Sequence, residues 1–138
     1  MLKRAILILI IILLPSANIH AEEYKKVEIF DIDKGKVVKV VKSNSKIQKA
    51  AVSYINEITG IYCKFKPIPD KGYGIKISLQ PSVTIKNKWI DTVIDEVIII
   101  IPKDEDPPFL IIFENKDKLL CFTFKGDIDI LLKKLSLP

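Results

Sequence analysis

A β-hairpin is the first element that the pattern of apolar and polar residues predicts. Val27 to Ile32 is rich in β-branched and aromatic residues, Asp33-Lys34-Gly35 is a turn signal, and the valines of residues 37–41 form a return strand. Lysines interrupt this second strand at positions 36, 39 and 42. We therefore expect it to lie near an edge of the sheet or to have one face in water.

Two helices are predicted, a long one after the hairpin and a short one at the C-terminus. Asn44 and Ser45 signal the start of the first helix, and Ser45 with Gln48 matches a capping box. Gly60 stands at the position expected for the glycine that ends this helix. The apolar stripe of this helix consists of Ile47, Ala50, Ala51, Tyr54, Ile55 and Ile58. Asp127 can cap the second helix, whose apolar residues are Ile128, Leu131, Leu132 and Leu135.

The residues between these helices predict a run of strands. Ile61 to Phe65 is a short strand. Residues 75–79 alternate as a half-buried strand, which Pro81 interrupts and Val83 and Ile85 resume up to Asn87. Residues 89–97 fit either a helical turn or a strand. Val97 to Ile101 is continuously apolar and β-branched, which indicates a central strand buried on both faces.

A second hairpin completes the predicted fold. Phe109 to Phe113 and Leu119 to Phe124 flank the turn signal Asn115-Lys116-Asp117. The elements follow the order β-β-α-β-β-β-β-β-α. We predict an α+β fold in which a mostly antiparallel sheet carries one main helix and a short C-terminal helix.

The first 21 residues have the layout of a secretory signal peptide. Lys3 and Arg4 are basic, Ala5 to Leu14 is an unbroken apolar run, and Ala17 to Ala21 offers small residues for cleavage. A membrane-spanning helix needs about 20 apolar residues, so an uncleaved anchor is the less favoured alternative. We predict a signal peptide over residues 1–21, cleaved after Ala21, and a single α+β domain over 22–138, secreted or held at the cell envelope.

Cleavage would change the composition of the chain. The only methionine, arginine and histidine are Met1, Arg4 and His20, and the net charge falls from +5 to +3 because Lys3 and Arg4 are lost. Without histidine, the domain has no Ser-His-Asp or Cys-His pair and no imidazole ligand. Without arginine, it lacks the side chain best suited to bidentate phosphate or guanine recognition. We therefore expect no cofactor, no metal site and no nucleic-acid partner.

Two acidic motifs suggest chemistry that the sequence does not favour. Asp31-Ile32-Asp33 resembles the start of a calcium loop, but Gly35 and Lys42 occupy positions where an EF-hand needs oxygen ligands. Asp104 and Glu105, with Asp95, are the candidate carboxylates of a small hydrolase. Acids beside Pro107-Pro108 are typical of an exposed loop, so the hydrolase is the alternative reading.

Cys63 and Cys121 are a possible disulfide pair. Export would place them where a bridge persists, and a bridge closing this long loop is worth about 3–5 kcal/mol. Each cysteine also lies among aromatic residues, where a free thiol packs as a small apolar group. Both possibilities stay open.

Tyr62, Tyr73 and Trp89 are the candidate binding aromatics. Exposed aromatic rings give a sugar- or peptide-binding site a large contact area at low entropic cost. A role in core packing is the alternative for each of them.

The sequence resembles a group of small exported proteins of unknown function from Gram-positive, endospore-forming bacteria. The likeness covers nearly all of the predicted mature chain, and it is carried by Asn44-Ser45, Ile47-Gln48, Ile58-Thr59-Gly60-Ile61-Tyr62, Pro67-Ile68-Pro69, Gly72-Tyr73, Pro81-Ser82-Val83, Asn87 and Trp89. It implies export and a single domain, and it transfers no functional residue.

These observations favour a non-enzymatic binding or interaction module outside the cell or at its envelope. The expected partner is a protein, a peptide or a cell-wall polymer, reached through an aromatic site or through a strand edge such as the lysine-bearing hairpin. Contact with a membrane is expected only through the leader, if that segment stays uncleaved.

Overall fold

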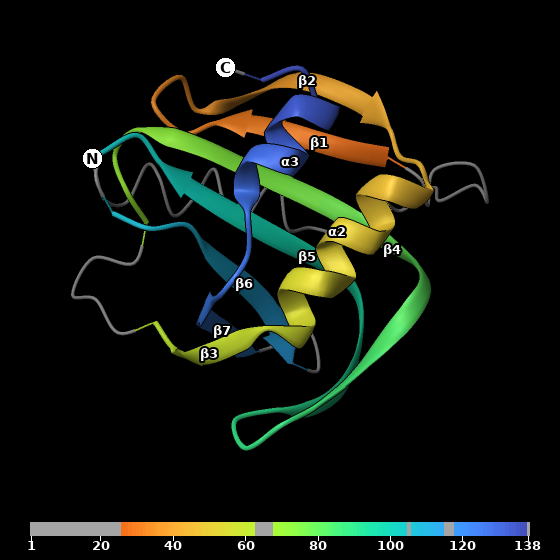
Figure 1. Cartoon of the computed structure of the whole chain (residues 1–138). Coiled ribbons are helices and arrows are strands. Elements are labelled where there is room, and N and C mark those ends of the chain that lie inside the picture. The colour runs from red at the N-terminus through yellow and green to blue at the C-terminus, as the bar shows by residue number, and fades with distance from the viewer. Residues whose placement is uncertain (1–25, 63–67, 105, 115–117, 138) are drawn as a thin grey trace.

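One antiparallel sheet carries two helices on one face (Figure 1). The computed structural model describes residues 26–62, 68–104, 106–114 and 118–137, so the predicted leader lies outside the described residues. The helices are α2 (Ser45–Asn56) and α3 (Ile128–Lys134), and the strands are β1 (Lys26–Asp31), β2 (Lys36–Lys42), β3 (Ile58–Ile61), β4 (Gly72–Lys86), β5 (Asp91–Pro102), β6 (Phe109–Glu114) and β7 (Lys118–Phe124). The α+β fold and its element order are confirmed.

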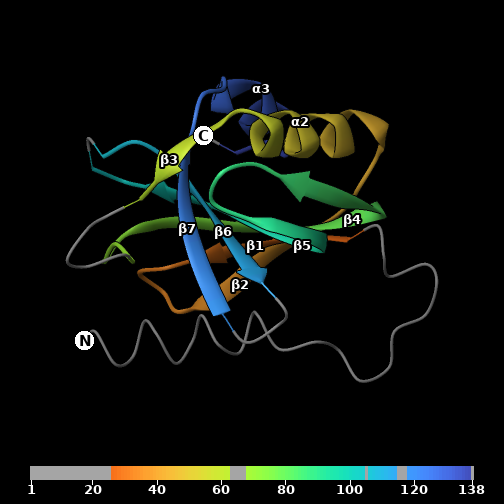
Figure 2. The ribbon, with the colours of Figure 1, turned by 90° about the horizontal axis from the view of Figure 1, so that it is seen from below.

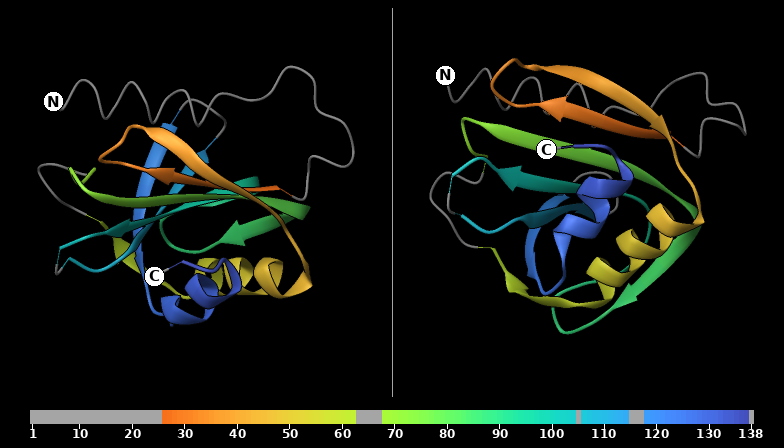
Figure 3. Two further views of the ribbon diagram at one scale, coloured as in Figure 1. Left: turned by 90° about the horizontal axis from the view of Figure 1, so that it is seen from above. Right: turned by 45° about the horizontal axis from the view of Figure 1, so that its top comes forward.

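The seven strands lie in the order β2-β1-β4-β5-β6-β7-β3. Every neighbouring pair is antiparallel. The strand β5 is central, and β2 and β3 form the two edges, as the right-hand view of Figure 3 shows for β2. The chain crosses from one edge to the other through α2, which explains why one helix separates the first hairpin from the remaining strands.

The continuous apolar run in β5 serves two cores. Val97 and Ile99 belong to the core between the sheet and the helices, whereas Ile98 and Ile100 belong to a second cluster on the opposite face. Because successive side chains of a strand point to opposite faces, a strand buried on both sides must be apolar at every position. The prediction of a central strand at residues 97–101 is therefore confirmed.

Both helices lie over the same face of the sheet (Figure 2). The helix α2 buries Ile47, Ala51, Tyr54 and Ile55, which recur at helical spacing. The helix α3 buries Leu131 beside it. Asp127 caps α3, as predicted, and its carboxylate accepts a hydrogen bond from the backbone N–H of Asp129 at 2.9 Å. This layer shields the sheet and leaves β2 open along its outer side.

The boundaries of α2 differ from the prediction at both ends. The N-cap is Asn44, whose side-chain oxygen accepts from the backbone N–H of Ile47, so Ser45 is already helical. The C-cap is Glu57, and Gly60 lies within β3 instead of ending the helix. The helix ends without a glycine because the backbone N–H of Glu57 donates hydrogen bonds to the carbonyls of Ser53 and Tyr54.

The long hairpin of β4 and β5 confirms one expectation and resolves an open one. Pro81 interrupts the strand without ending it, as predicted: β4 runs on to Lys86, and its pairing with β5 shifts register between Ser78 and Val83. The ambiguous residues 89–97 form no helical turn, since β5 begins at Asp91. A bulged strand tolerates a proline because the ladder is already interrupted there.

Candidate binding site

A pocket of about 490 Å³ opens at the end of the sheet where three chain segments meet. We call it the turn pocket, and its lining residues are Asp31, Asp33, Lys34, Lys71, Gly72, Tyr73, Ile101, Pro102, Lys103 and Leu132. The segments are the β1–β2 turn, the start of β4 and the end of β5, and α3 adds Leu132 to the lining. Of the three aromatic residues predicted to bind a ligand, Tyr73 is the one that lines this pocket.

Backbone hydrogen bonds hold the three segments together. The N–H of Ile32 donates to the carbonyl of Gly72 at 3.0 Å, and the N–H of Lys103 donates to the carbonyl of Lys71 at 3.1 Å. Gly72 has a φ of 136°, and a Cβ atom there would collide with the carbonyl oxygen of Ile101. A glycine is therefore required where β4 starts against the end of β5.

Each of these segments brings one lysine to the pocket. Lys34, Lys71 and Lys103 are all exposed, whereas Tyr73 is half-buried and packs against the helix-side core. The Asp31 carboxylate already accepts a hydrogen bond of 3.0 Å from the backbone N–H of Lys34. Lysine ammonium groups carry three donors each, so the pocket can bind a negatively charged group beside an apolar or aromatic surface.

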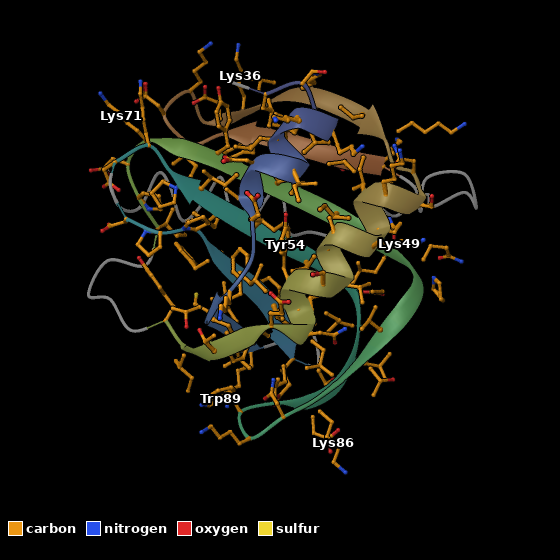
Figure 4. All side chains as sticks on the ribbon, in the orientation of Figure 1. Lys36, Lys49, Tyr54, Lys71, Lys86 and Trp89 are labelled. Carbon is orange, nitrogen blue, oxygen red and sulfur yellow. The ribbon has the colours of Figure 1, made fainter. Side chains whose placement is uncertain are left out.

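The other two candidate aromatics lie elsewhere. Tyr62 stacks on Phe109 on the far face of the sheet, with ring centroids 4.0 Å apart and an interplanar angle of 9°. Trp89 sits in the turn between β4 and β5, and Lys88 approaches its ring at 5.0 Å. In Figure 4, Trp89 and Lys71 lie at opposite ends of the molecule. The structure therefore does not gather the three rings into one platform.

Cys121 lies half-buried in β7, next to the far-face cluster. Burial raises the pKa of its thiol to about 11, which suppresses the reactive thiolate. Its carbonyl accepts a hydrogen bond from the N–H of Tyr62 at 2.9 Å. Cys63, the next residue in the sequence, lies outside the described residues, so the disulfide stays a prediction.

The carboxylates proposed for hydrolysis are separated along the sheet. Asp95 lies within β5, whereas Asp104 follows the end of this strand at Pro102. Seven strand residues at about 3.3 Å each put more than ~20 Å between them, well beyond the ~5–10 Å of a glycosidase pair. Glu105 lies outside the described residues. This separation gives no support to a pair formed by Asp95 and Asp104.

One carboxylate of β5 does have a shifted pKa. Burial raises the pKa of Glu96, and the nearby Lys76 ammonium, 3.5 Å away, opposes this rise. The pair lies in the middle of the paired region of β4 and β5, outside the turn pocket. Its position is that of a half-buried structural ion pair.

Residues 26–62, 68–104, 106–114 and 118–137 form neither a cluster of metal ligands nor a membrane-spanning helix. Those residues include no group of three histidine, cysteine or acidic side chains that could hold a metal ion. None of the helices formed by the same residues has the length and apolar character needed to cross a membrane.

A second pocket, of about 420 Å³, lies at the start of α2. We call it the helix-start pocket; it is lined by Lys42, Ser43, Asn44, Ser45, Gln48, Lys49 and Gln80. Gln48 does not complete the predicted capping box. Its amide nitrogen donates to the Ser43 hydroxyl at 2.9 Å and to the Ser78 carbonyl at 2.7 Å, and its amide oxygen accepts from the Gln80 N–H at 3.0 Å. Gln48 thus ties the helix start to β4.

The strand β2 connects these two pockets. Lys34 of the turn pocket precedes it in the chain, and its last residue, Lys42, lines the helix-start pocket. Within the described residues β2 pairs with β1 alone. Its three lysines, Lys36, Lys39 and Lys42, make up what we call the lysine edge, which matches the edge position predicted for this strand.

Comparison of the chain with family models, curated proteins and solved structures finds no match. The function is therefore inferred from the chemistry of the pockets and of the lysine edge.

Proposed function

We propose that this chain is a non-enzymatic binding module that works outside the cell or at the cell envelope. The observation that carries the proposal is the turn pocket, which is lined by lysines from three separate segments and by the half-buried Tyr73. A pocket with a partly apolar lining and a few convergent polar groups is typical of a ligand site. The signal-peptide layout of residues 1–21 supports the location.

The partner that suits this pocket is negatively charged. Lys34, Lys71 and Lys103 can donate to phosphate or carboxylate oxygens, and the Tyr73 ring offers a surface for a sugar ring or a side chain. An acidic protein, an acidic peptide or an anionic cell-wall polymer would satisfy this chemistry. Exposed lysines contribute mostly to the rate and specificity of such binding.

Nuclear magnetic resonance titration tests the proposal directly. We expect an anionic probe, such as an oligomer of glycerol phosphate or an acidic peptide, to shift the amide signals of Gly72, Tyr73 and Lys103. A neutral oligosaccharide of equal length is the control ligand. The proposal is wrong if none of the anionic probes moves these signals at millimolar concentration.

A charge-reversal variant locates the site. Lys71→Glu should abolish the shifts, because it replaces an attractive group at the rim with a repulsive one. Lys86→Glu is the matched control, since Lys86 is exposed at the far end of β4, away from Lys71 in Figure 4. Equal effects of the two reversals would show that only net charge is recognised.

A further inference from the structure

We infer that the lysine edge of β2 accepts an extended acidic peptide segment, which pairs with it as an eighth strand of the sheet. This inference deepens the proposed function, on which it rests, by naming the partner class and its mode of binding. It starts from the exposure of the strand. All but one of its seven residues are exposed, and Val37, Val38 and Val40 retain 39 %, 41 % and 57 % of their accessible surface.

The open side of β2 is also a row of backbone groups. In the described residues the strand has β1 on one side and no strand on the other. The outward N–H and C=O groups of an edge strand can be matched in alternation by an added strand. The seven residues of β2 span about 23 Å, long enough for a stable ladder with a peptide of similar length.

A bulge gives the two faces of β2 different chemistry. The pairing with β1 shifts register between Ile29 and Phe30, so that Ile29 faces Lys39 and Phe30 faces Val37. Since cross-strand partners share a face, Lys39 lies on the helix side with the core residue Ile29, and Val37 lies on the far side with Phe30.

Two of the remaining pairs extend this pattern. Lys36 lies opposite Asp31 and shares the helix side with Lys39, whereas Val40 lies opposite Glu28 and shares the far side with Val37. The last two residues of the strand reverse it, since Val41 lies opposite the core residue Val27 on the helix side and Lys42 lies opposite Lys26 on the far side. Between Lys36 and Val40 the edge therefore presents lysines to the helix side and valines to the far side, and a partner strand that alternates carboxylates with β-branched residues fits both faces there.

A second copy of this chain, pairing through its own β2, is not the favoured partner of the edge, because like charges would face each other. Antiparallel pairing of two β2 strands centred on Lys39 would place Lys39 against Lys39 on the helix side, and facing like charges destabilise a ladder. Within the described residues neither Lys36 nor Lys42 forms an ion pair. The nearest carboxylates opposite β2, Glu28 and Asp31, belong to the neighbouring strand β1 and not to the open edge.

The positions of the pockets extend the same surface. The turn pocket adjoins one end of β2 and the helix-start pocket adjoins the other, so both ends of a bound strand would meet further lysines, Lys34 and Lys49. The Nζ atom of Lys39 donates to the Leu135 carbonyl at 2.8 Å, which leaves two of its three donors for a partner.

The test uses a labelled nine-residue peptide that alternates glutamate and valine, with both ends capped, and measures its binding to the purified protein by fluorescence anisotropy. We expect saturable binding of this peptide and none of the lysine–valine peptide of equal length. The charge reversal Lys36→Glu should lower the affinity for the acidic peptide about fivefold or more and raise the affinity for the lysine–valine peptide. Lys86→Glu, a reversal at a distant exposed site, should change neither.

Backbone methylation separates strand pairing from simple charge attraction. One acidic peptide is N-methylated at its glutamates and another at its valines, because only every second amide of an added strand faces the edge. We expect one methylated peptide to bind and the other to fail.

Equal binding of both methylated peptides would overturn the inference and leave the proposed anion-binding function in place. Failure of the unmethylated acidic peptide would overturn the inference as well. Glycerol phosphate oligomers, titrated against the turn pocket, then decide whether the proposed function falls with it.

Discussion

The Nζ atom of Lys39 lies 2.8 Å from the carbonyl oxygen of Leu135 and donates a hydrogen bond to it. Leu135 is the C-cap of α3, so this contact fastens the edge strand to the end of the C-terminal helix. A cation at a helix C-terminus is favourable because the last carbonyls are unsatisfied and partly negative. The edge that we propose as a docking strand is thereby fixed in place before any partner arrives.

Replacement of this lysine should destabilise the fold slightly. Lys39→Met keeps most of the aliphatic length and removes the charge and the hydrogen bond, and we expect a loss of about 1 kcal/mol in the free energy of unfolding. Chemical denaturation measures the loss. Lys36→Met is the matched control and should change stability by less than about 0.5 kcal/mol. Equal effects of both variants would contradict the role assigned to the Leu135 contact.

The hydroxyl of Tyr54 joins the two helices. It donates a hydrogen bond of 2.8 Å to the carbonyl of Asp127, the N-cap of α3. Tyr54→Phe removes this bond and should cost about 1 kcal/mol in the free energy of unfolding. Tyr73→Phe, at a half-buried position, is the control and is expected to cost less.

Tyr54 also predicts a dependence of stability on alkaline pH. Burial, followed by the charges of Asp127 and Asp129, raises its pKa from 10.0 to about 12. Because the folded state holds this proton more tightly, the associated stability is complete below pH 10 and disappears as the pH rises towards 12. The difference in stability between the wild type and Tyr54→Phe should therefore narrow across this range. An unchanged difference would show that the phenol pKa is not raised.

Gly72 should not tolerate a side chain. With a φ of 136° and the Ile101 carbonyl oxygen in the place of a Cβ atom, Gly72→Ala should destabilise the protein by about 1–3 kcal/mol or more and shift the signals of the turn pocket. Gly74→Ala is the comparison, since the nearest side-chain atom to its new Cβ would be Cδ1 of Ile100 at 3.5 Å. Thermal unfolding of both variants distinguishes a local collision from a general cost of losing glycine.

The thiol of Cys121 should react slowly in the reduced, folded protein. Burial raises its pKa to about 11, so the thiolate is scarce near neutral pH. We expect iodoacetamide to label Cys121 much faster after unfolding than before it, as followed by mass spectrometry. Labelling at the rate of an exposed cysteine would contradict this. The same assay without reductant shows whether Cys63 and Cys121 form the predicted disulfide.

The sequence pattern predicts the elements better than their ends. A strand with one buried face alternates apolar and polar residues, as β4 does at Ile75 and Ile77, and a strand with two buried faces is apolar throughout, as β5 is. Both patterns are visible in a short stretch of sequence, so these strands could be predicted. The ends of α2 depend on which of several neighbouring residues caps the helix. Asn44 is the N-cap because its side-chain oxygen accepts a hydrogen bond from the backbone N–H of Ile47. The resumption of the strand after Pro81 was predicted from the alternation at Val83 and Ile85, whereas the register shift that accommodates the proline had no signal in the sequence.

The turn pocket could not be predicted from the sequence. Lys34, Lys71 and Lys103 look like ordinary exposed lysines until the sheet brings their three segments together. Of its residues, Tyr73 was singled out for its ring and Gly72 stands beside it in a glycine-rich loop, but neither signal identifies a pocket. The edge position of β2 was predicted, because repeated lysines in a strand indicate an exposed edge. The bulge that places Lys36 and Lys39 on the helix side and Val37 and Val40 on the far side had no signal in the sequence.

Amide hydrogen exchange of β2 tests the central claim most directly. An added strand would form hydrogen bonds to the outward amides of residues 36–42, so the acidic nine-residue peptide should slow exchange at alternate positions of β2 and leave the opposite edge, β3, unchanged. The account predicts this alternating protection in the wild type and, at a peptide concentration that half-saturates the wild type, weaker protection in Lys36→Glu. Saturating peptide that leaves every β2 amide exchanging at its original rate would contradict it.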